Sequence, residues 1–196
     1  MRACAGDVPY FYPLHFTLYT LIVTMPPSAE TFSLWFMPSG EVYARLSTII
    51  RQLSSRYGGP EFLPHVTLLG SLAGRRHEVI SKSAEVAASI RPFTIRLGEI
   101  GFLDEYFRCL FVRAALSAPL RHAHQVACRK FNGGRRAAFM PHLSLLYGNY
   151  PLRLKREVIA EFGPRLDLQF KLRSIHLYQT QDDPVNWRRV ARFGLS

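Results

Sequence analysis

Two short stretches of this chain nearly match: LPHVTLLG at residues 63–70 and MPHLSLLYG at residues 140–148. In a β-strand, successive side chains point to opposite faces, so His65 and Thr67 share one face, and His142 and Ser144 do the same. A chain that contains this motif twice can bring two imidazoles and two hydroxyls to one cleft. Such a set of groups is suited to acid–base chemistry on a phosphate.

One His-x-Thr pattern alone is weak evidence of function, because such a histidine is more often a packed or surface residue. The chain contains an example in His15-Phe16-Thr17, which lacks both the proline directly before the histidine and the Leu-Leu-Gly ending. The two long motifs share these features. We therefore interpret His65 and His142 as a functional pair and His15 as unrelated to them.

Length and composition are those of one well-packed domain. The 196 residues are 48% hydrophobic and 13% aromatic, which argues against disorder, and the formal net charge of +11 fits a phosphate-bearing partner. The excess charge is uneven: residues 106–156 hold ten Lys or Arg and no Asp or Glu, whereas residues 31–105 hold eight basic and seven acidic side chains. Several of these cations are expected on solvated helix faces, so the run alone does not predict a nucleic-acid interface.

The three cysteines, Cys4, Cys109 and Cys128, form neither a C-x-x-C pair nor a metal-ligand pattern. Their odd number argues against a full disulfide framework and favours a reducing compartment, so we expect a cytoplasmic protein. A single bridge between Cys109 and Cys128 stays open, because spacing does not decide it. We expect no metal and no cofactor.

The first thirty residues stand apart from the rest. No Asp, Glu, Lys or Arg occurs from Val8 to Ala29, and the segment from Leu14 to Met25 is largely apolar. This segment is shorter than the about 20 apolar residues that cross a bilayer, and no small-x-small cleavage site of a signal peptide is evident. An added strand stays open. We interpret residues 1–30 as an extension outside the functional domain at 31–196, and expect no membrane contact.

The remaining residues repeat one order of elements. In the first half we expect a strand at 33–37, a helix at 42–57, the His65 strand, a helix through 79–90 and a strand at 93–97. In the second half we expect a strand at 106–116, a helix at 120–131, the His142 strand, a helix at 151–162 and a strand at 166–172. The alternation then shifts by one residue near Ser174, which indicates a bulge or a change of strand.

The two copies are in register with each other. The histidines lie 77 positions apart, and the first helices begin near Val42 and Pro119, also 77 apart. A chance repeat of a short motif would not carry its flanking helices with it. We therefore predict an α+β fold, a two-lobed pseudo-twofold repeat of β-α-β-α-β units with antiparallel sheets flanking a central cleft. The lobes are expected near 31–105 and 106–196, with strand exchange between them left open.

The paired motifs resemble those of the two-histidine (2H) phosphoesterase superfamily, whose mark is two His-x-Thr/Ser motifs on facing lobes. The stretch PHLSLLYG at 141–148 is similar to the cyclic phosphodiesterase branch known from fungi and plants. The same holds for SLWF at 33–36 and for LYQT at 177–180, which leads to Trp187. The resemblance covers about residues 33 to 193.

This resemblance implies metal-free hydrolysis of ADP-ribose 1″,2″-cyclic phosphate, which is left after tRNA splicing, and of nucleoside 2′,3′-cyclic phosphates to monoesters. One neutral histidine would take a proton from the attacking water, and the other, protonated, would donate to the leaving ribose oxygen. Thr67 and Ser144 would bind the nonbridging oxygens, where charge builds. The sequence does not say which of His65 and His142 is the base.

Further residues are candidates for substrate binding: Tyr106, Phe107, Tyr147 and Trp187 for stacking on a base, and Arg135 and Arg136 for contact with phosphate. Each aromatic residue alone is more readily explained by core or edge packing, and each arginine can as easily be solvated. The expected partner is a small nucleotide-like cyclic phosphate, bound by a monomer.

Two other functions fit the same residues. Another branch of the superfamily ligates or trims RNA ends, and a long basic channel would favour that branch, whereas the compact chain favours a small substrate. A binding module without turnover would hold RNA or nucleotide on the basic half. Binding alone, however, does not require two matched proton carriers.

Overall fold

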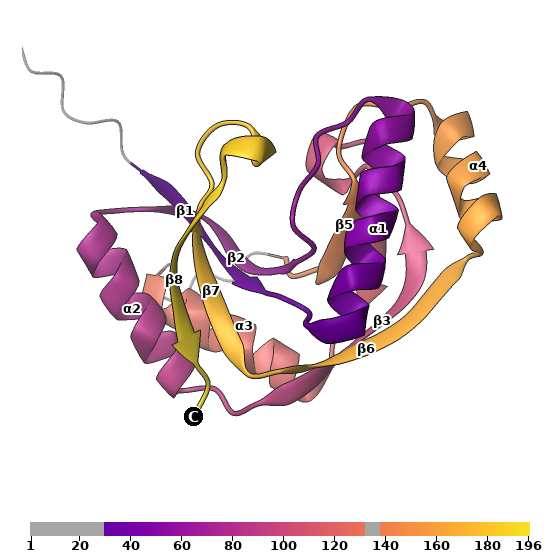
Figure 1. Ribbon diagram of the computed structural model, residues 1–196. Helices are drawn as coiled ribbons and strands as arrows, with labels where there is room; N and C mark the ends of the chain where they lie inside the picture. Colours follow the sequence, from indigo (N-terminus) through magenta and orange to yellow (C-terminus); the bar gives the residue numbers. More distant parts are fainter. Residues whose placement is uncertain (1–29, 132–137) are drawn as a thin grey trace, which may run out of the picture.

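Two copies of a β-α-β-α-β unit make up most of the chain, as the sequence predicts (Figure 1). The computed structural model describes residues 30–131 and 138–196, so the predictions for residues 1–29, His15, Arg135 and Arg136 lie outside the described residues. The first copy consists of β1 (Thr31–Phe36), α1 (Gly40–Tyr57), β2 (Val66–Ala73), α2 (Arg76–Ala88) and β3 (Phe93–Gly101). The second copy consists of β4 (Leu110–Ala114), α3 (Ala118–Phe131), β5 (His142–Leu146), α4 (Leu152–Phe162) and β6 (Arg165–Leu172). Two more strands follow, β7 (Ser174–Gln179) and β8 (Arg188–Gly194).

The eight strands form one antiparallel sheet in the order β6-β3-β4-β5-β2-β1-β7-β8. The two motif strands, β2 and β5, lie at its centre and pair through Val66 and Leu143. Strands of the two sequence halves interleave, because β3 pairs with β4 and β6 while β7 pairs with β1. The motif strands of the two copies are therefore direct neighbours.

The irregularity near Ser174 is a change of strand. β6 pairs with β3 at one edge of the sheet, and β7 starts two residues after β6 ends and pairs with β1 and β8 in the other half.

The single strand expected at 106–116 is shorter, because residues 106–108 form a 3₁₀ turn. This turn is closed by hydrogen bonds from Leu103 N–H to the Arg108 carbonyl and from Arg108 N–H to the Glu105 carbonyl. These local bonds use backbone groups that a strand would need for its ladder, so β4 begins only at Leu110.

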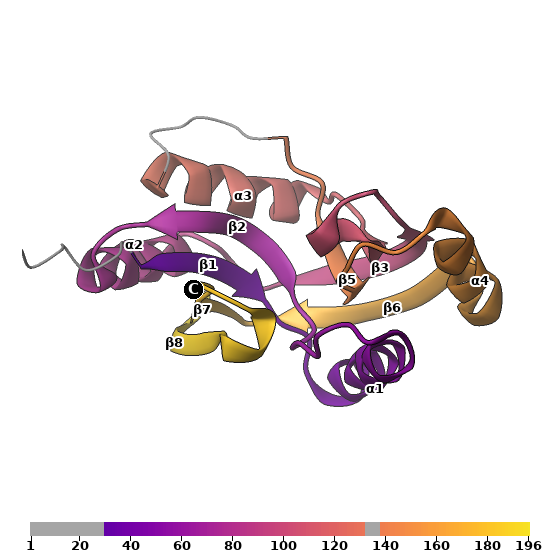
Figure 2. The same ribbon diagram turned by 90° about the horizontal axis from the view of Figure 1, so that it is seen from above.

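The first helix of each copy packs on the motif strand of the other copy. α1 follows β1 but contacts β5, and α3 follows β4 but contacts β2. Both views show α1 and α4 toward one end of the molecule and α2 toward the opposite end (Figures 1 and 2). α1 buries an apolar stripe that includes Leu46, Ile50 and Leu53, and it ends at Gly58, whose φ of 77° suits glycine.

Alternation along the two motif strands fixes which side chains enter the core. Val66 and Leu68 on β2, and Leu143 and Leu145 on β5, are no more than 1% exposed. Burying one such side chain contributes roughly 1.5–3 kcal/mol, and a slip of one residue would turn all four away from the core. The histidines and hydroxyls between them are held on the other face.

Candidate active site

The pairing of Val66 with Leu143 brings the two motifs together. Because the strands are antiparallel, His65 then lies opposite Ser144, and Thr67 lies opposite His142. Each histidine thus faces the hydroxyl of the other motif, and all four side chains point to one face of the sheet. The charge of His142 also lowers the pKa of His65, so the two rings are close enough to interact.

Two further residues lie in the same row across the sheet. Arg113 on β4 is the direct partner of His142, and Trp35 on β1 is the direct partner of Thr67. The Arg113 guanidinium carbon lies 5.6 Å from the centre of the Phe111 ring, which in turn lies 5.1 Å from the His142 ring. The sequence singled out neither Arg113 nor Trp35 as a site residue, because only the strand pairing makes them neighbours of the motifs.

Both histidines are oriented by the same backbone contact. His65 Nδ1 lies 2.6 Å from the Leu63 carbonyl oxygen, and His142 Nδ1 lies 2.8 Å from the Met140 carbonyl oxygen. In the neutral ring Nδ1–H donates to this oxygen, which leaves the lone pair on Nε2. The proline between carbonyl and histidine has a fixed φ and holds the preceding residue extended. This contact explains why both motifs place proline directly before histidine.

His65 is the more deeply buried of the pair. It is 6% exposed, and its ring stacks on Trp35 with 3.7 Å between ring centres. Burial lowers the pKa of His65 from the ordinary 6.5 to about 4, with a smaller lowering from the charge of His142, while the bond to the Leu63 carbonyl opposes the shift. His65 is therefore neutral at pH 7 and suited to accept a proton.

His142 is partly exposed and lies among charged groups. Burial lowers its pKa, and the charges of Arg108 and Arg113 lower it further, whereas the Met140 carbonyl and Glu105 raise it. A bound phosphate anion would offset the two guanidinium charges and favour the protonated ring. This arrangement suits a proton donor that is charged only while an anion is bound.

The two hydroxyls differ in their surroundings. Thr67 is partly exposed, and its hydroxyl has no hydrogen-bond partner within residues 30–131 and 138–196. The Ser144 hydroxyl is buried and donates to the Phe107 carbonyl at 2.9 Å. Tyr147 is only 3% exposed, stacks on Phe62 at 3.7 Å and interacts with Ser144 through its phenol. Tyr147 thus lies behind Ser144, with no open ring face for a base.

The other predicted aromatic residues border the histidine face. Tyr106 and Phe107 lie on the 3₁₀ turn and are 38% and 51% exposed. Trp187, in the connection between β7 and β8, has its ring centre 5.4 Å from Trp35 and 6.2 Å from Phe107. Next to these rings lies a cavity of about 470 Å³, here called the aromatic cavity. Its aromatic lining residues are Trp35, Tyr43, Phe62, Tyr178 and Trp187.

Other features expected from the sequence are located as follows. Cys109 and Cys128 are both buried, and no disulfide bridge joins them to each other. Within the described parts of the chain, no group of three or more His, Cys, Asp or Glu side chains is arranged to hold a metal ion. Among the helices of those same parts, none is both long and apolar enough to cross a membrane.

Several known proteins are similar to this chain in sequence or in fold. Residues 38–184 match the model of the 2'-5' RNA ligase superfamily. The chain is 25% identical to a cyclic phosphodiesterase of Arabidopsis thaliana over 169 residues, which is 83% of this chain and 93% of the relative. Solved structures share the fold: TT0787 of Thermus thermophilus has 19% identity and a TM-score of 0.59, covering 84% of this chain and 97% of that one. E. coli LigT complexed with 3'-AMP has 16% identity and a TM-score of 0.56, covering 86% and 99%.

Proposed function

The chain belongs to the 2'-5' RNA ligase superfamily of two-histidine phosphoesterases and is an enzyme of that kind, and we propose that it hydrolyses cyclic phosphodiesters to phosphomonoesters. The observation that carries the proposal is the pairing of Val66 with Leu143, which places two histidines and two hydroxyls on one face. The similarity to the Arabidopsis thaliana cyclic phosphodiesterase supports the same reaction. As substrates we propose nucleoside 2′,3′-cyclic phosphates and ADP-ribose 1″,2″-cyclic phosphate.

In this mechanism His65 is the base and His142 the acid. Nε2 of neutral His65 takes a proton from water as the water oxygen attacks phosphorus. The bond from phosphorus to one ribose oxygen breaks, and Nε2–H of protonated His142 donates its proton to that oxygen. The low pKa of His65 supports its role as base. The charges of Arg108 and Arg113 lower the pKa of His142, and a bound anion would offset these charges, so His142 would keep its proton while the anion is bound.

The nonbridging oxygens would be bound by groups in the same row. Thr67 has a hydroxyl proton that is free to donate. Ser144 would turn its proton from the Phe107 carbonyl to the phosphate, with Tyr147 packed behind it. Arg113, directly opposite His142, would offset the negative charge that develops on these oxygens.

The aromatic cavity is the proposed site of the base. Its volume of about 470 Å³ is within the range of small-molecule sites, and Trp35 connects it to the histidine by stacking on His65. Stacking of a base on an aromatic ring contributes roughly 1–3 kcal/mol and tolerates different bases. Tyr106 and Phe107, on the 3₁₀ turn, border the histidine face and would contact the ribose.

The test is turnover of adenosine 2′,3′-cyclic phosphate and of ADP-ribose 1″,2″-cyclic phosphate by the purified chain, with and without EDTA. We expect a monoester product and equal rates in both conditions. Loss of activity on chelation with recovery on adding a divalent ion would refute the metal-free mechanism. Absence of turnover of both substrates would refute the function.

A second candidate is processing of RNA ends, which is compatible with the ten cations within residues 106–156 although that run alone does not predict it. A long RNA that contacts many of them would release many counterions, so its affinity would fall steeply with salt, whereas a cyclic mononucleotide would show a shallow dependence. Tight RNA binding at physiological salt combined with poor turnover of mononucleotides would favour this candidate.

A further inference from the structure

A second cavity, of about 600 Å³, lies beside β6, β7, β8 and the start of α1, and is here called the basic cavity. Five of its lining residues have cationic or titratable nitrogen groups, namely Lys171, Arg173, His176, Arg189 and Arg192. No Asp or Glu is among the described residues that line it. The basic cavity therefore has a charge that only an anion would balance.

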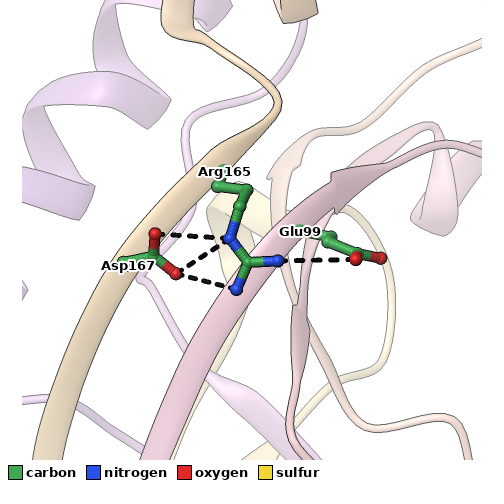
Figure 3. A network of polar contacts seen from close by, with 3 residues as sticks. All are labelled: Glu99, Arg165 and Asp167. Carbon is green, nitrogen blue, oxygen red and sulfur yellow. Dashed lines mark hydrogen bonds and ion pairs between the residues drawn. The ribbon is translucent and has the colours of Figure 1, made fainter.

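The part of the protein that the structure describes does not neutralise the positive charge of this cavity. Within residues 30–131 and 138–196, none of its lysine or arginine side chains forms an ion pair with a carboxylate. Another cavity, lined by Arg165, shows the usual alternative (Figure 3). There Arg165 lies 2.9 Å from an Asp167 oxygen and 3.4 Å from a Glu99 oxygen, so its charge is paired.

One residue that lines the basic cavity, His176, has an unsatisfied polar atom. Arg192 Nε donates to the Ser174 hydroxyl oxygen at 3.1 Å, and that hydroxyl lies 3.1 Å from His176 Nε2. His176 Nδ1 is buried and has no hydrogen-bond partner among the described residues. Buried polar atoms are usually hydrogen-bonded, so a buried ring nitrogen without a partner is unusual in a surface that serves only packing.

The basic cavity is connected to the proposed active site by shared walls. Leu63 and Tyr178 line both the basic and the aromatic cavity. The Tyr178 ring stacks on Trp35 at 4.0 Å, and Trp35 stacks on His65 at 3.7 Å. Two stacked rings, Trp35 and Tyr178, therefore lead from His65 to the wall of the basic cavity.

We propose that the basic cavity binds a second phosphate of the substrate, distinct from the cyclic phosphate that reacts. This inference rests on the proposed function and narrows its substrate class to cyclic phosphates that carry a further phosphate or pyrophosphate beyond the nucleoside. Guanidinium groups suit this role because they donate two parallel hydrogen bonds to phosphate oxygens. Arg189 and Arg192 on β8 are the principal donors.

The first test compares adenosine 2′,3′-cyclic phosphate with the same compound bearing a 5′-phosphate. We expect kcat/KM to be about tenfold higher for the 5′-phosphorylated substrate, the size expected for one charge-assisted contact site. In the double variant Arg189→Gln/Arg192→Gln this ratio should fall to about one. The matched control Arg165→Gln removes a paired arginine and should leave the ratio of the two kcat/KM values unchanged. The charge-preserving double variant Arg189→Lys/Arg192→Lys should retain most of this ratio. A ratio near one in the unaltered protein would overturn the proposal.

The second test does not depend on turnover. Calorimetry would compare binding of adenosine 3′-monophosphate with that of adenosine 3′,5′-bisphosphate, neither of which contains a cyclic phosphate. If the bisphosphate binds more tightly and the double variant loses this difference, the proposal is supported. This holds even if no cyclic phosphate is hydrolysed, because then only the proposed reaction fails. Equal affinities would overturn it. Binding of inorganic phosphate by the arginines without a difference between the two nucleotides would also overturn it, because the cavity would then serve a separate anion.

Discussion

The indole ring of Trp35 lies flat against the imidazole ring of His65, with ring centres 3.7 Å apart and an angle of 13° between the planes. Trp35 itself is 2% exposed. The indole therefore excludes water from one face of the imidazole, and burial is the largest cause of the low pKa of His65. The stacking keeps His65 in the neutral state that its proposed role as base requires.

Replacing Trp35 with leucine should raise the pKa of His65 from about 4 toward the ordinary 6.5, because water would reach the ring. Titration of the His65 ring proton by NMR measures the shift directly. Trp35→Phe keeps an aromatic ring against His65 and serves as the control. An unchanged pKa in folded Trp35→Leu protein would show that the indole is not what shields the ring.

Alanine at either His65 or His142 should lower turnover by roughly 10²–10⁴-fold, the usual contribution of a general acid or base. The protein should still fold, which circular dichroism can verify, because neither ring is the sole filling of the apolar core. His15→Ala is the matched control and should leave turnover unchanged. Near-normal activity in both folded motif variants would mean that His65 and His142 are not the proton-transfer pair. A comparable loss in His15→Ala would mean that a different motif carries the activity.

The dependence of kcat/KM on pH should be bell-shaped with its maximum on the acid side of neutrality. Protonation of His65 removes the base as the pH falls toward about 4, and deprotonation of His142 removes the acid at a pKa lowered from 6.5. Arg113→Gln removes a charge that lowers the pKa of His142, so the alkaline limb should move to higher pH. Glu105→Gln removes a charge that raises this pKa and should move the limb the other way. Equal shifts in both variants would contradict the assignment of His142 as acid.

The glycines that end the two motifs should respond differently to alanine. Gly148 has a φ of 142°, and a Cβ there would collide with the Tyr150 ring, so Gly148→Ala should lower the free energy of unfolding by roughly 1–3 kcal/mol. At Gly70 the nearest atoms to a Cβ lie 3.6 Å away, an ordinary contact. Gly70→Ala should change stability by about 0.5 kcal/mol or less. Urea denaturation of the two variants checks the difference, and equal losses would contradict it.

Much of the fold was predictable because its signals are local. Alternation along 63–70 and 140–148 placed His65 with Thr67 and His142 with Ser144, and apolar periodicity located all four helices. The short turn at 106–108 was missed because its cause is a set of backbone bonds made at the end of β3, which residue types do not reveal. The change of strand after β6 was foreseen only as one of two alternatives, since the same shift in alternation also describes a bulge.

Several site properties came only from contacts between distant segments. Arg113 was one of ten cations within residues 106–156, and its place beside His142 depends on the pairing of β4 with β5. Tyr147 was a candidate for stacking on a base, with core packing as the alternative, and packing against Phe62 leaves it 3% exposed. The basic cavity combines β6, β7 and β8 with the start of α1 and with Leu63.

The sequence by itself determined which side chains of each motif share a face, because the alternation of a strand follows from covalent geometry. It also placed a proline directly before each histidine, and the structure shows that the carbonyl preceding this proline lies next to Nδ1 in both motifs. Only the tertiary structure decided that the two motif strands lie side by side and that Trp35 covers His65. Pairing and register between strands 77 residues apart depend on burying Val66, Leu68 and their partners on β5 beneath α1 and α3, which is a property of the whole packed chain.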